Sequence, residues 1–166
     1  MADITFAPVA TLSAADLYYN FADTDLGPTY FVFHGTNLVF LGFSRNAADI
    51  VTPILRQWPV KSCQIDKDLK LDVAAPPAIQ LHGTDFQIRV WRALCALQYG
   101  QRVSYGALGQ ELKSGARAVG RAVGANPVAW FGPCHRVIRQ SGELGGYRWG
   151  LSTKQKLLEI ESFSAK

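Results

Sequence analysis

The sequence predicts an α+β protein, in which a small N-terminal α/β domain with antiparallel strands precedes a mostly helical C-terminal domain with a helix-turn-helix. Two observations predict this order. Aromatic and β-branched runs occur early in the chain, whereas apolar residues recur at helical spacing in its second half. The Ala-Ala-Pro-Pro-Ala stretch at 74–78 interrupts any regular element between the two regions. We therefore expect domains over residues 1–80 and 81–166.

The first half of the chain contains the strand signals. Residues 29–33 and 38–43 are rich in aromatic and β-branched side chains and flank His-Gly-Thr-Asn at 34–37, so we expect a β-hairpin. A helix is expected over 46–57, with Pro53 as a complication inside it. This half contains no chemical motif, which favours a supporting role.

Helix signals dominate the second half. Apolar residues recur every three or four positions over 85–97, and Asp85 suits the N-terminal cap of that helix. A last helix is expected over about 153–162, where leucine and isoleucine recur.

Two short helices are expected between these longer ones. Ser104 can cap a helix that runs through Leu112, and a turn at 113–115 leads into a second helix over 116–124. Asn-Pro at 126–127 prevents its continuation. Two short helices joined by three residues that include glycine have the outline of a helix-turn-helix.

The second short helix has an unusual surface. Arg117 and Arg121 lie four residues apart and share one exposed face. Another face carries almost no side chain, because it consists of Ala116, Gly120 and Gly124. Each glycine costs about 1 kcal/mol of helix stability relative to alanine. The small residues therefore indicate close approach of another surface, either a DNA backbone or narrow minor groove or a neighbouring helix.

The net charge of +4 is unevenly distributed. Residues 1–80 contain five basic and eight acidic side chains, whereas residues 81–166 contain twelve basic and five acidic ones. A net charge of +7 on the second half suggests that it meets a polyanion, although a solvated basic face would have the same composition.

Three cysteines, Cys63, Cys95 and Cys134, make neither a disulfide framework nor a paired metal site, so we expect no metal and a reducing, cytoplasmic location. No apolar run approaches the roughly 20 residues that span a bilayer. The N-terminus lacks a basic segment leading into an apolar one, so neither a secretory signal nor a membrane partner is expected.

Cys134 has the most reactive surroundings of the three. It lies in Pro-Cys-His-Arg-Val at 133–137, with Arg139 nearby, and these basic groups predict that the thiolate is favoured over the thiol. A histidine base beside a cysteine needs an orienting partner, often a carboxylate. The acidic residues that the second half offers are Asp85, Glu111, Glu143, Glu159 and Glu161. The Gly-rich loop at 141–147 is flexible enough to fold over a small ligand.

The motif at 133–137, preceded by Asn126-Pro127 and followed by Gly-Tyr-Arg-Trp-Gly at 146–150, strongly resembles the O6-alkylguanine-DNA alkyltransferases. The resemblance covers about residues 81–162. It implies a DNA repair protein that flips O6-alkylguanine out of double-stranded DNA through the minor groove and transfers the alkyl group irreversibly to its own cysteine. Such a protein works once per molecule, without a cofactor and as a monomer.

The resemblance also implies roles for individual residues. Cys134 would accept the alkyl group, and His135 would act through a water as its base. Glu161 would orient and charge-stabilise that histidine. Asn126 would organise the turn at the site, and Tyr105 would assist the departing guanine through N3.

Contacts to DNA and to the flipped base follow by the same resemblance. Arg117 would fill the gap left by the extruded base, on a helix whose other DNA-facing residues are Ala116, Ala118, Gly120 and Arg121. Tyr147 would hydrogen-bond near O6, and main-chain atoms at Cys134 and Val137 would read the guanine amine. Trp149, at the end of the Gly-rich loop, would either wall the pocket or cover its mouth. A surface tryptophan packed on the last helix is the alternative.

The sequence departs from the family pattern in three places. The two short helices are joined more tightly than is common, Trp-Phe-Gly at 130–132 replaces a typically aliphatic strand, and residues 1–62 lack the cysteines of a zinc site. The main rival is a non-catalytic helix-turn-helix protein that recognises alkylated or regulatory DNA, against which the acceptor Cys134 and the small residues at 116–124 argue. A Cys–His hydrolase is disfavoured, because adjacent Cys134 and His135 would normally point apart.

Overall fold

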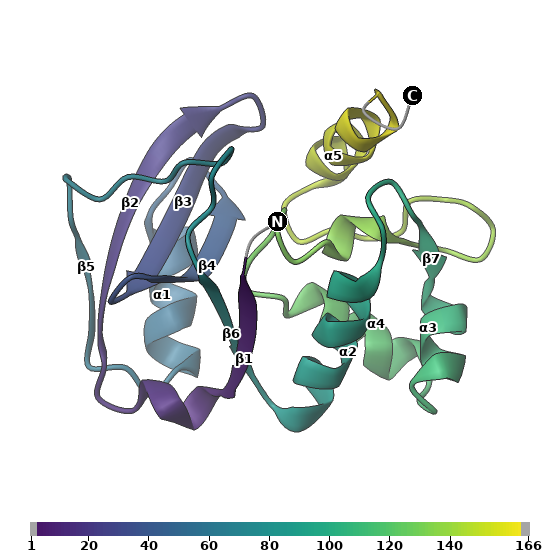
Figure 1. The fold of residues 1–166 in the computed structure, drawn as a ribbon, viewed down its shortest axis with the longest axis horizontal. Coiled ribbons are helices and arrows are strands. Elements are labelled where there is room, and N and C mark those ends of the chain that lie inside the picture. The colour runs from purple at the N-terminus through teal and green to yellow at the C-terminus, as the bar shows by residue number, and fades with distance from the viewer. Residues whose placement is uncertain (1–2, 164–166) are drawn as a thin grey trace. The chain divides into compact units, whose positions relative to one another are not determined.

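The computed structural model describes residues 3–163 and divides the chain into two compact units, Met1–Thr84 and Asp85–Lys166 (Figure 1). The architecture is α+β, with a six-stranded mixed sheet in the first unit and most of the helices in the second. The expected boundary at residue 80 falls inside strand β6 (Ile79–Gly83), which is part of that sheet. The Ala/Pro-rich stretch at 74–78 therefore precedes a strand of the first unit.

The sheet has the strand order β1-β6-β4-β3-β2-β5. Its other strands are β1 (Ile4–Pro8), β2 (Asp16–Thr24), β3 (Gly27–His34), β4 (Asn37–Phe43) and β5 (Ser62–Ile65). Strands β2, β3 and β4 form an antiparallel meander, and β3–β4 confirms the predicted hairpin. The remaining pairings, β1–β6, β4–β6 and β2–β5, are parallel, so the sheet is mixed rather than antiparallel throughout.

Helix α1 (Ala48–Gln57) accompanies the sheet in the first unit, and the 3-10 helix η1 (Val9–Leu12) links β1 to β2. Helix α1 begins two residues later than predicted because Asn46 Oδ1 accepts a hydrogen bond from the Ala48 N–H at 3.0 Å, which holds the chain in a turn. Pro53 is accommodated inside the helix. Ile50 and Ile54 are buried, as their spacing of four residues requires for one apolar face.

The second unit contains four α-helices among the described residues. Its elements are α2 (Asp85–Ala96), β7 (Val103–Ser104), α3 (Tyr105–Glu111), α4 (Ala116–Gly124), η2 (Cys134–Arg136), β8 (Val137–Ile138) and α5 (Leu151–Phe163). Ser104 caps α3 as predicted, since its Oγ accepts from the Ala107 N–H at 3.0 Å. Helix α4 has the predicted bounds, and α5 begins two residues earlier than expected.

Two contacts fix α4 in place. The Trp91 indole N–H of α2 donates to Ala122 O at 2.8 Å, with Val119 and Val123 buried alongside. The turn between α3 and α4 is so tight that a Cβ on Gly109 would lie 2.7 Å from Ser114 O. Only glycine fits there. Helix α4 consequently keeps its arginine-bearing face at the surface.

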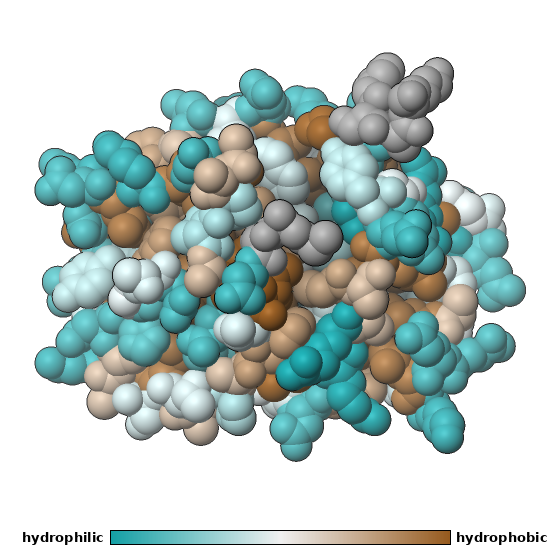
Figure 2. All heavy atoms as spheres, viewed as in Figure 1, coloured by the Kyte–Doolittle hydropathy of each residue, from teal (hydrophilic) through white to brown (hydrophobic). Residues whose placement is uncertain are grey.

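Hydrophobic and hydrophilic residues are mixed over the face of the molecule that Figure 2 shows. Over residues 3–163, no helix combines the length and the apolar character that crossing a membrane requires.

Candidate active site

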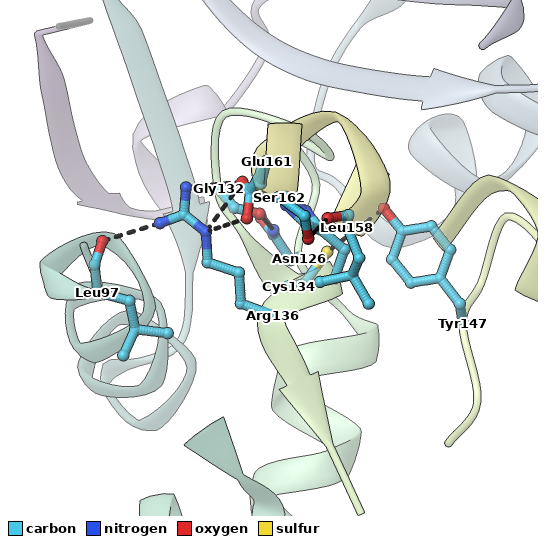
Figure 3. A network of polar contacts seen from close by, with 10 residues as sticks. Leu97, Asn126, Gly132, Cys134, Arg136, Tyr147, Leu158, Glu161 and Ser162 are labelled. Atoms are coloured by element: carbon cyan, nitrogen blue, oxygen red, sulfur yellow. Dashed lines mark hydrogen bonds and ion pairs between the residues drawn. The ribbon is translucent and has the colours of Figure 1, made fainter. Parts of the chain in front are cut away.

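Cys134 begins the short helix η2, and only 6% of its surface is exposed. Its N–H donates to Gly132 O at 2.6 Å across Pro133, which closes a tight turn at the sulfur-bearing residue. The thiol lies 3.9 Å from Oη of Tyr147, toward which it donates (Figure 3). The fold therefore presents the sulfur to Tyr147 rather than to bulk solvent.

A cavity of about 310 Å³ opens beside the sulfur. Six residues predicted for the site line it: Tyr105, Gly120, Asn126, Cys134, Tyr147 and Trp149. Four further lining residues were not predicted: Val123, Gly124, Gly146 and Arg148. Small-molecule pockets typically begin at about 300 Å³, so the cavity suits one flat ring with a small substituent. Within residues 3–163, no three His, Cys, Asp or Glu side chains gather where a metal ion could bind.

The prediction that its surroundings favour the thiolate of Cys134 was wrong. Burial raises the pKa of the Cys134 thiol, and hydrogen bonding with Asn126 and Tyr147 and the charge of Lys154 only partly oppose it. The neighbouring arginines contribute little because they point elsewhere. Arg136 is bound to Glu161, and Arg139 is exposed and paired with Glu143 at 3.2 Å. The resting sulfur is a thiol, so a base must remove its proton.

A buried network of three side chains, His135, Arg136 and Glu161, adjoins the cysteine, and Figure 3 labels the Arg136–Glu161 part of it. His135 Nε2 lies 2.9 Å from Oε1 of Glu161, as the predicted pairing requires. Arg136 adds what sequence reasoning missed: its Nε lies 3.0 Å from each Glu161 oxygen, and its Nη2 lies 2.8 Å from Oε1. Arg136 Nη1 also donates to Leu97 O at 2.8 Å, which ties the network to the end of α2.

The network sets the protonation of its members. Burial by itself raises the pKa of Glu161, but hydrogen bonds from His135 and Arg136 outweigh it and lower that pKa to about 2. Burial lowers the pKa of His135, and the attraction of Glu161 only partly opposes this. At neutral pH the imidazole is therefore neutral and donates its Nε2 proton to the carboxylate. Its Nδ1 is then an acceptor, and this buried atom has no hydrogen-bond partner among the described residues.

Asn126 organises the chain that leads to the cysteine. Its Nδ2 donates to Gly132 O at 2.6 Å, and its Oδ1 accepts from the Val128 N–H at 3.2 Å. A Cβ on Gly132 would lie 2.8 Å from Asn126 Nδ2, so the glycine is required by this contact. The segment 130–132 is a turn in which Trp130 has φ +71° and stacks on the Phe131 ring at 6.1 Å.

Comparison with known proteins places this chain in a family. Residues 85–163 match the model of the 6-O-methylguanine DNA methyltransferase, DNA binding domain. The methylated-DNA-protein-cysteine methyltransferase of Mycobacterium tuberculosis is 36% identical over 167 residues, which cover 90% of this chain and 94% of that protein. This chain belongs to the methylated-DNA-protein-cysteine methyltransferase family.

Two further relatives support the same family assignment. The inducible methylated-DNA-protein-cysteine methyltransferase of Bacillus subtilis is 48% identical over 85 residues, half of this chain and 48% of that protein. The crystal structure of Mycobacterium tuberculosis OGT in complex with DNA superposes with a TM-score of 0.71 at 33% identity, over 88% of this chain and 93% of that one. Similarity to this family thus extends over both units of the chain.

The small-residue face of α4 is not filled by packing within the described chain. A Cβ on Gly124 would meet nothing within 4 Å, and one on Gly120 would only reach the Tyr105 ring at 3.7 Å. Arg117 and Arg121 are exposed on the same helix, as are Ala116 and, in part, Ala118. These four exposed or partly exposed residues do not line the cavity, so they lie on a surface apart from the pocket wall.

Of the other predicted residues, Tyr105, Tyr147 and Trp149 line the cavity, whereas Val137 does not. Tyr105 is half-buried beside Gly145, and burial raises the pKa of its hydroxyl. Burial likewise raises the pKa of Tyr147. Val137 is buried and its carbonyl accepts from Lys154 Nζ at 2.6 Å, so that carbonyl already has one partner. Trp149 is half-buried in the wall of the cavity, which favours the pocket-wall alternative over a surface position on α5.

Lys154 is a residue of the site that sequence reasoning missed. Its side chain is fully buried, and Nζ donates to the carbonyls of Val137, Leu144 and Gly146. Burial lowers the pKa of Lys154 to about 8, although the nearby Cys134 opposes this. The sequence does contain a signal for it: positions 154, 157, 158 and 161 form one helical stripe, and all four side chains are buried. A lysine on such a stripe needs buried acceptors, here the carbonyls of Val137 in β8 and of Leu144 and Gly146 in the Gly-rich loop.

Proposed function

We propose that this chain repairs DNA by transferring the alkyl group of O6-alkylguanine to Sγ of Cys134, once per molecule. One observation carries the proposal: the sulfur lies on the wall of a cavity of base size, in the residue next to a buried His135–Glu161 pair. Membership of the methylated-DNA-protein-cysteine methyltransferase family supports it. A non-catalytic helix-turn-helix DNA-binding protein would not require an ionisable pair buried beside a cysteine.

The first step is removal of the thiol proton. Because burial raises the pKa of Cys134, the thiolate must be formed when substrate is in place. The acceptor is Nδ1 of His135, reached through one water, and Glu161 stabilises the imidazolium that results. Lys154 and the Tyr147 hydroxyl reduce the cost of the developing negative charge on sulfur.

The second step is an in-line displacement at the alkyl carbon. The thiolate forms the S–C bond while the C–O6 bond breaks, and the electron pair leaves with guanine. Tyr105 donates a hydrogen bond or proton toward N3 of the base, and Tyr147 hydrogen-bonds near O6. Backbone atoms at Cys134 and Val137 read the exocyclic amine. The product thioether contains no bond that water readily hydrolyses, so the protein is consumed.

DNA is engaged by α3 and α4, which we propose form a helix-turn-helix. The bare face of α4 allows its backbone to approach a minor groove about 6 Å wide, where longer side chains would clash. Ala116, Ala118 and Gly120 lie against the groove, and Arg121 contacts phosphate. Arg117 stacks in the space left by the extruded nucleotide, which offsets part of the few kcal/mol that flipping costs.

The proposal includes a division of labour within one chain. Every residue assigned above lies in the unit Asp85–Lys166, so one monomer suffices for one lesion, and the unit Met1–Thr84 has a supporting role. A cytoplasmic location suits the three free cysteines, since the acceptor must stay reduced.

Comparison of Cys134→Ser with Cys95→Ser tests this function. Each variant is mixed with a duplex that contains one O6-methylguanine, and binding and intact protein mass are measured. We expect Cys134→Ser to bind the duplex but gain no mass, whereas Cys95→Ser gains one methyl group like the unaltered protein. Methylation of Cys134→Ser, or an unaltered protein that binds without gaining mass, would refute the proposal.

A further inference from the structure

Tyr99 lies just after helix α2 and takes no part in the steps described above. It is a surface residue, with 54% of its area exposed, whereas Arg136 is only 8% exposed. The guanidinium carbon of Arg136 nevertheless lies over the Tyr99 ring, 5.5 Å from its centroid, which is a cation–π distance. Because the ring is exposed and the guanidinium beneath it is not, Tyr99 separates that cation from solvent.

The segment that carries Tyr99 contacts the same guanidinium a second time. Leu97, two residues earlier, accepts a hydrogen bond through its carbonyl from Arg136 Nη1 at 2.8 Å (Figure 3). The segment is itself held by backbone hydrogen bonds, from the Leu97 N–H to Leu94 O at 3.1 Å and from the Gln101 N–H to Gln98 O at 3.0 Å. Residues 97–99 therefore fix Arg136 by its edge and by its face.

Glu161 transmits the position of Arg136 to the proposed base. Its Oε1 accepts hydrogen bonds from Arg136 Nη2 at 2.8 Å and Nε at 3.0 Å, and the same oxygen lies 2.9 Å from His135 Nε2. Since one oxygen serves both partners, a displaced guanidinium changes the direction of the His135 contact. That contact decides which ring nitrogen carries the proton, and so keeps Nδ1 as the acceptor.

We propose that Tyr99 is a positioning residue for alkyl transfer: its ring holds Arg136 in place, and Arg136 in turn fixes Glu161 against His135. The inference rests on the proposed function of the same site. Tyr99 does not line the cavity, so it acts through Arg136 and not on the substrate. Water at the guanidinium would compete for its charge-assisted hydrogen bonds, which are stronger where water is excluded.

A direct contact to DNA is the competing explanation for an exposed tyrosine. Such a contact would strengthen binding without changing the rate at saturating duplex, whereas positioning would change that rate and leave binding unaltered. Tyr99→Phe keeps the aromatic face, and Tyr99→Leu keeps apolar bulk without it. Tyr18→Leu is the matched control, because Tyr18 is an exposed tyrosine in β2 of the other unit.

Three quantities are measured for each variant. They are the affinity for O6-methylguanine duplex, the single-turnover transfer rate at saturating duplex, and the exchange with water of the His135 Nε2 proton. The last comes from NMR spectra of protein with nitrogen-labelled histidine, in which the signal of His135 is identified by its loss in His135→Asn. A merely structural role of Tyr99 would lower stability and leave the exchange of this proton in the folded protein unchanged.

We expect Tyr99→Leu to slow transfer about tenfold at unchanged duplex affinity, the equivalent of roughly 1.4 kcal/mol of activation free energy, and to speed exchange of the His135 proton. Tyr99→Phe should keep most of the rate, because the ring and not the hydroxyl contacts the cation. Tyr18→Leu should change none of the three quantities.

An unchanged transfer rate in Tyr99→Leu, with or without weaker duplex binding, would overturn the inference alone. An equal loss of rate in Tyr99→Phe would do the same, since it would assign the effect to the hydroxyl. An unaltered protein that transfers no methyl group would overturn the proposed function. Exchange of the His135 proton would then decide by itself whether Tyr99 orders the network, and unchanged exchange in Tyr99→Leu would reject that role.

Discussion

Replacing Glu161 by Gln removes the negative charge that balances a buried arginine and orients the proposed base. The carboxylate receives three contacts of 3.0 Å or less from Arg136 and one of 2.9 Å from His135. Breaking a buried ion pair by removing one partner typically costs about 3–5 kcal/mol, because the other charge is left uncompensated. We therefore expect Glu161→Gln to lose about that much free energy of unfolding, measured by urea denaturation.

The same substitution should slow alkyl transfer for a separate reason. A glutamine still accepts a hydrogen bond from His135, but it no longer stabilises the imidazolium, and general-base catalysis contributes about 100-fold or more. The double variant Arg136→Met/Glu161→Gln separates the two effects. Without the stranded guanidinium it should recover a large part of the lost stability. Its single-turnover rate on O6-methylguanine duplex should stay low.

Two results would refute this reasoning. A double variant that recovers the transfer rate together with stability would mean that Glu161 serves only the fold. A single variant as stable as the unaltered protein would mean that the Arg136–Glu161 contact is solvated and worth little. Glu159→Gln is the control, since Glu159 lies exposed on the same helix and should change neither measurement.

Four further predictions test other parts of the site. First, the pKa of Glu161 of about 2 lies below its usual value, so this carboxylate contributes about 3 kcal/mol of stability above pH 4–5 that is lost as pH falls toward 2, as acid titration of unfolding would show. Second, Lys154→Met should leave the Val137 carbonyl of β8 and two loop carbonyls without this donor, slow transfer and increase hydrogen exchange at residues 144–146, whereas unchanged exchange would exclude an anchoring role. Third, Arg117→Ala should slow repair of duplex far more than reaction with free O6-alkylguanine, because only duplex requires base flipping; equal losses would assign Arg117 to the pocket or the fold. Fourth, Trp149→Gly should raise the rate with free O6-benzylguanine relative to methyl transfer by roughly 5- to 150-fold, since overfilling a packed site costs about 1–3 kcal/mol; an unchanged ratio would exclude a pocket wall.

Elements with local sequence signals were predicted well. Helix α4 has the predicted bounds because Gly115 precedes it and Asn126-Pro127 follows, and both signals act within a few residues. The Ser104 cap is equally local. Strand β6 was missed because its five residues pair with β1, some 75 positions earlier, and no local sequence pattern predicts such a pairing.

The site shows the same division between local and distant information. The motif at 133–137 located the cysteine, but adjacency in sequence did not give the directions of the side chains. Arg136 follows His135 directly, yet it contacts Glu161, 25 residues away, and so does not stabilise the thiolate. Lys154 was missed because the carbonyls it binds come from β8 and from the loop before α5, and backbone groups leave no trace in the sequence. Such contacts follow from tertiary packing alone.

The most direct measurement of the central claim is the number and position of methyl groups transferred. The unaltered protein is incubated with a large excess of O6-methylguanine duplex, repaired guanine is quantified over time, and proteolytic peptides with Cys63, Cys95 and Cys134 are weighed. The account predicts one repaired guanine per protein molecule, one methyl group on the Cys134 peptide and no reaction afterwards. Continued turnover, or methyl groups on Cys63 or Cys95 in place of Cys134, would contradict it.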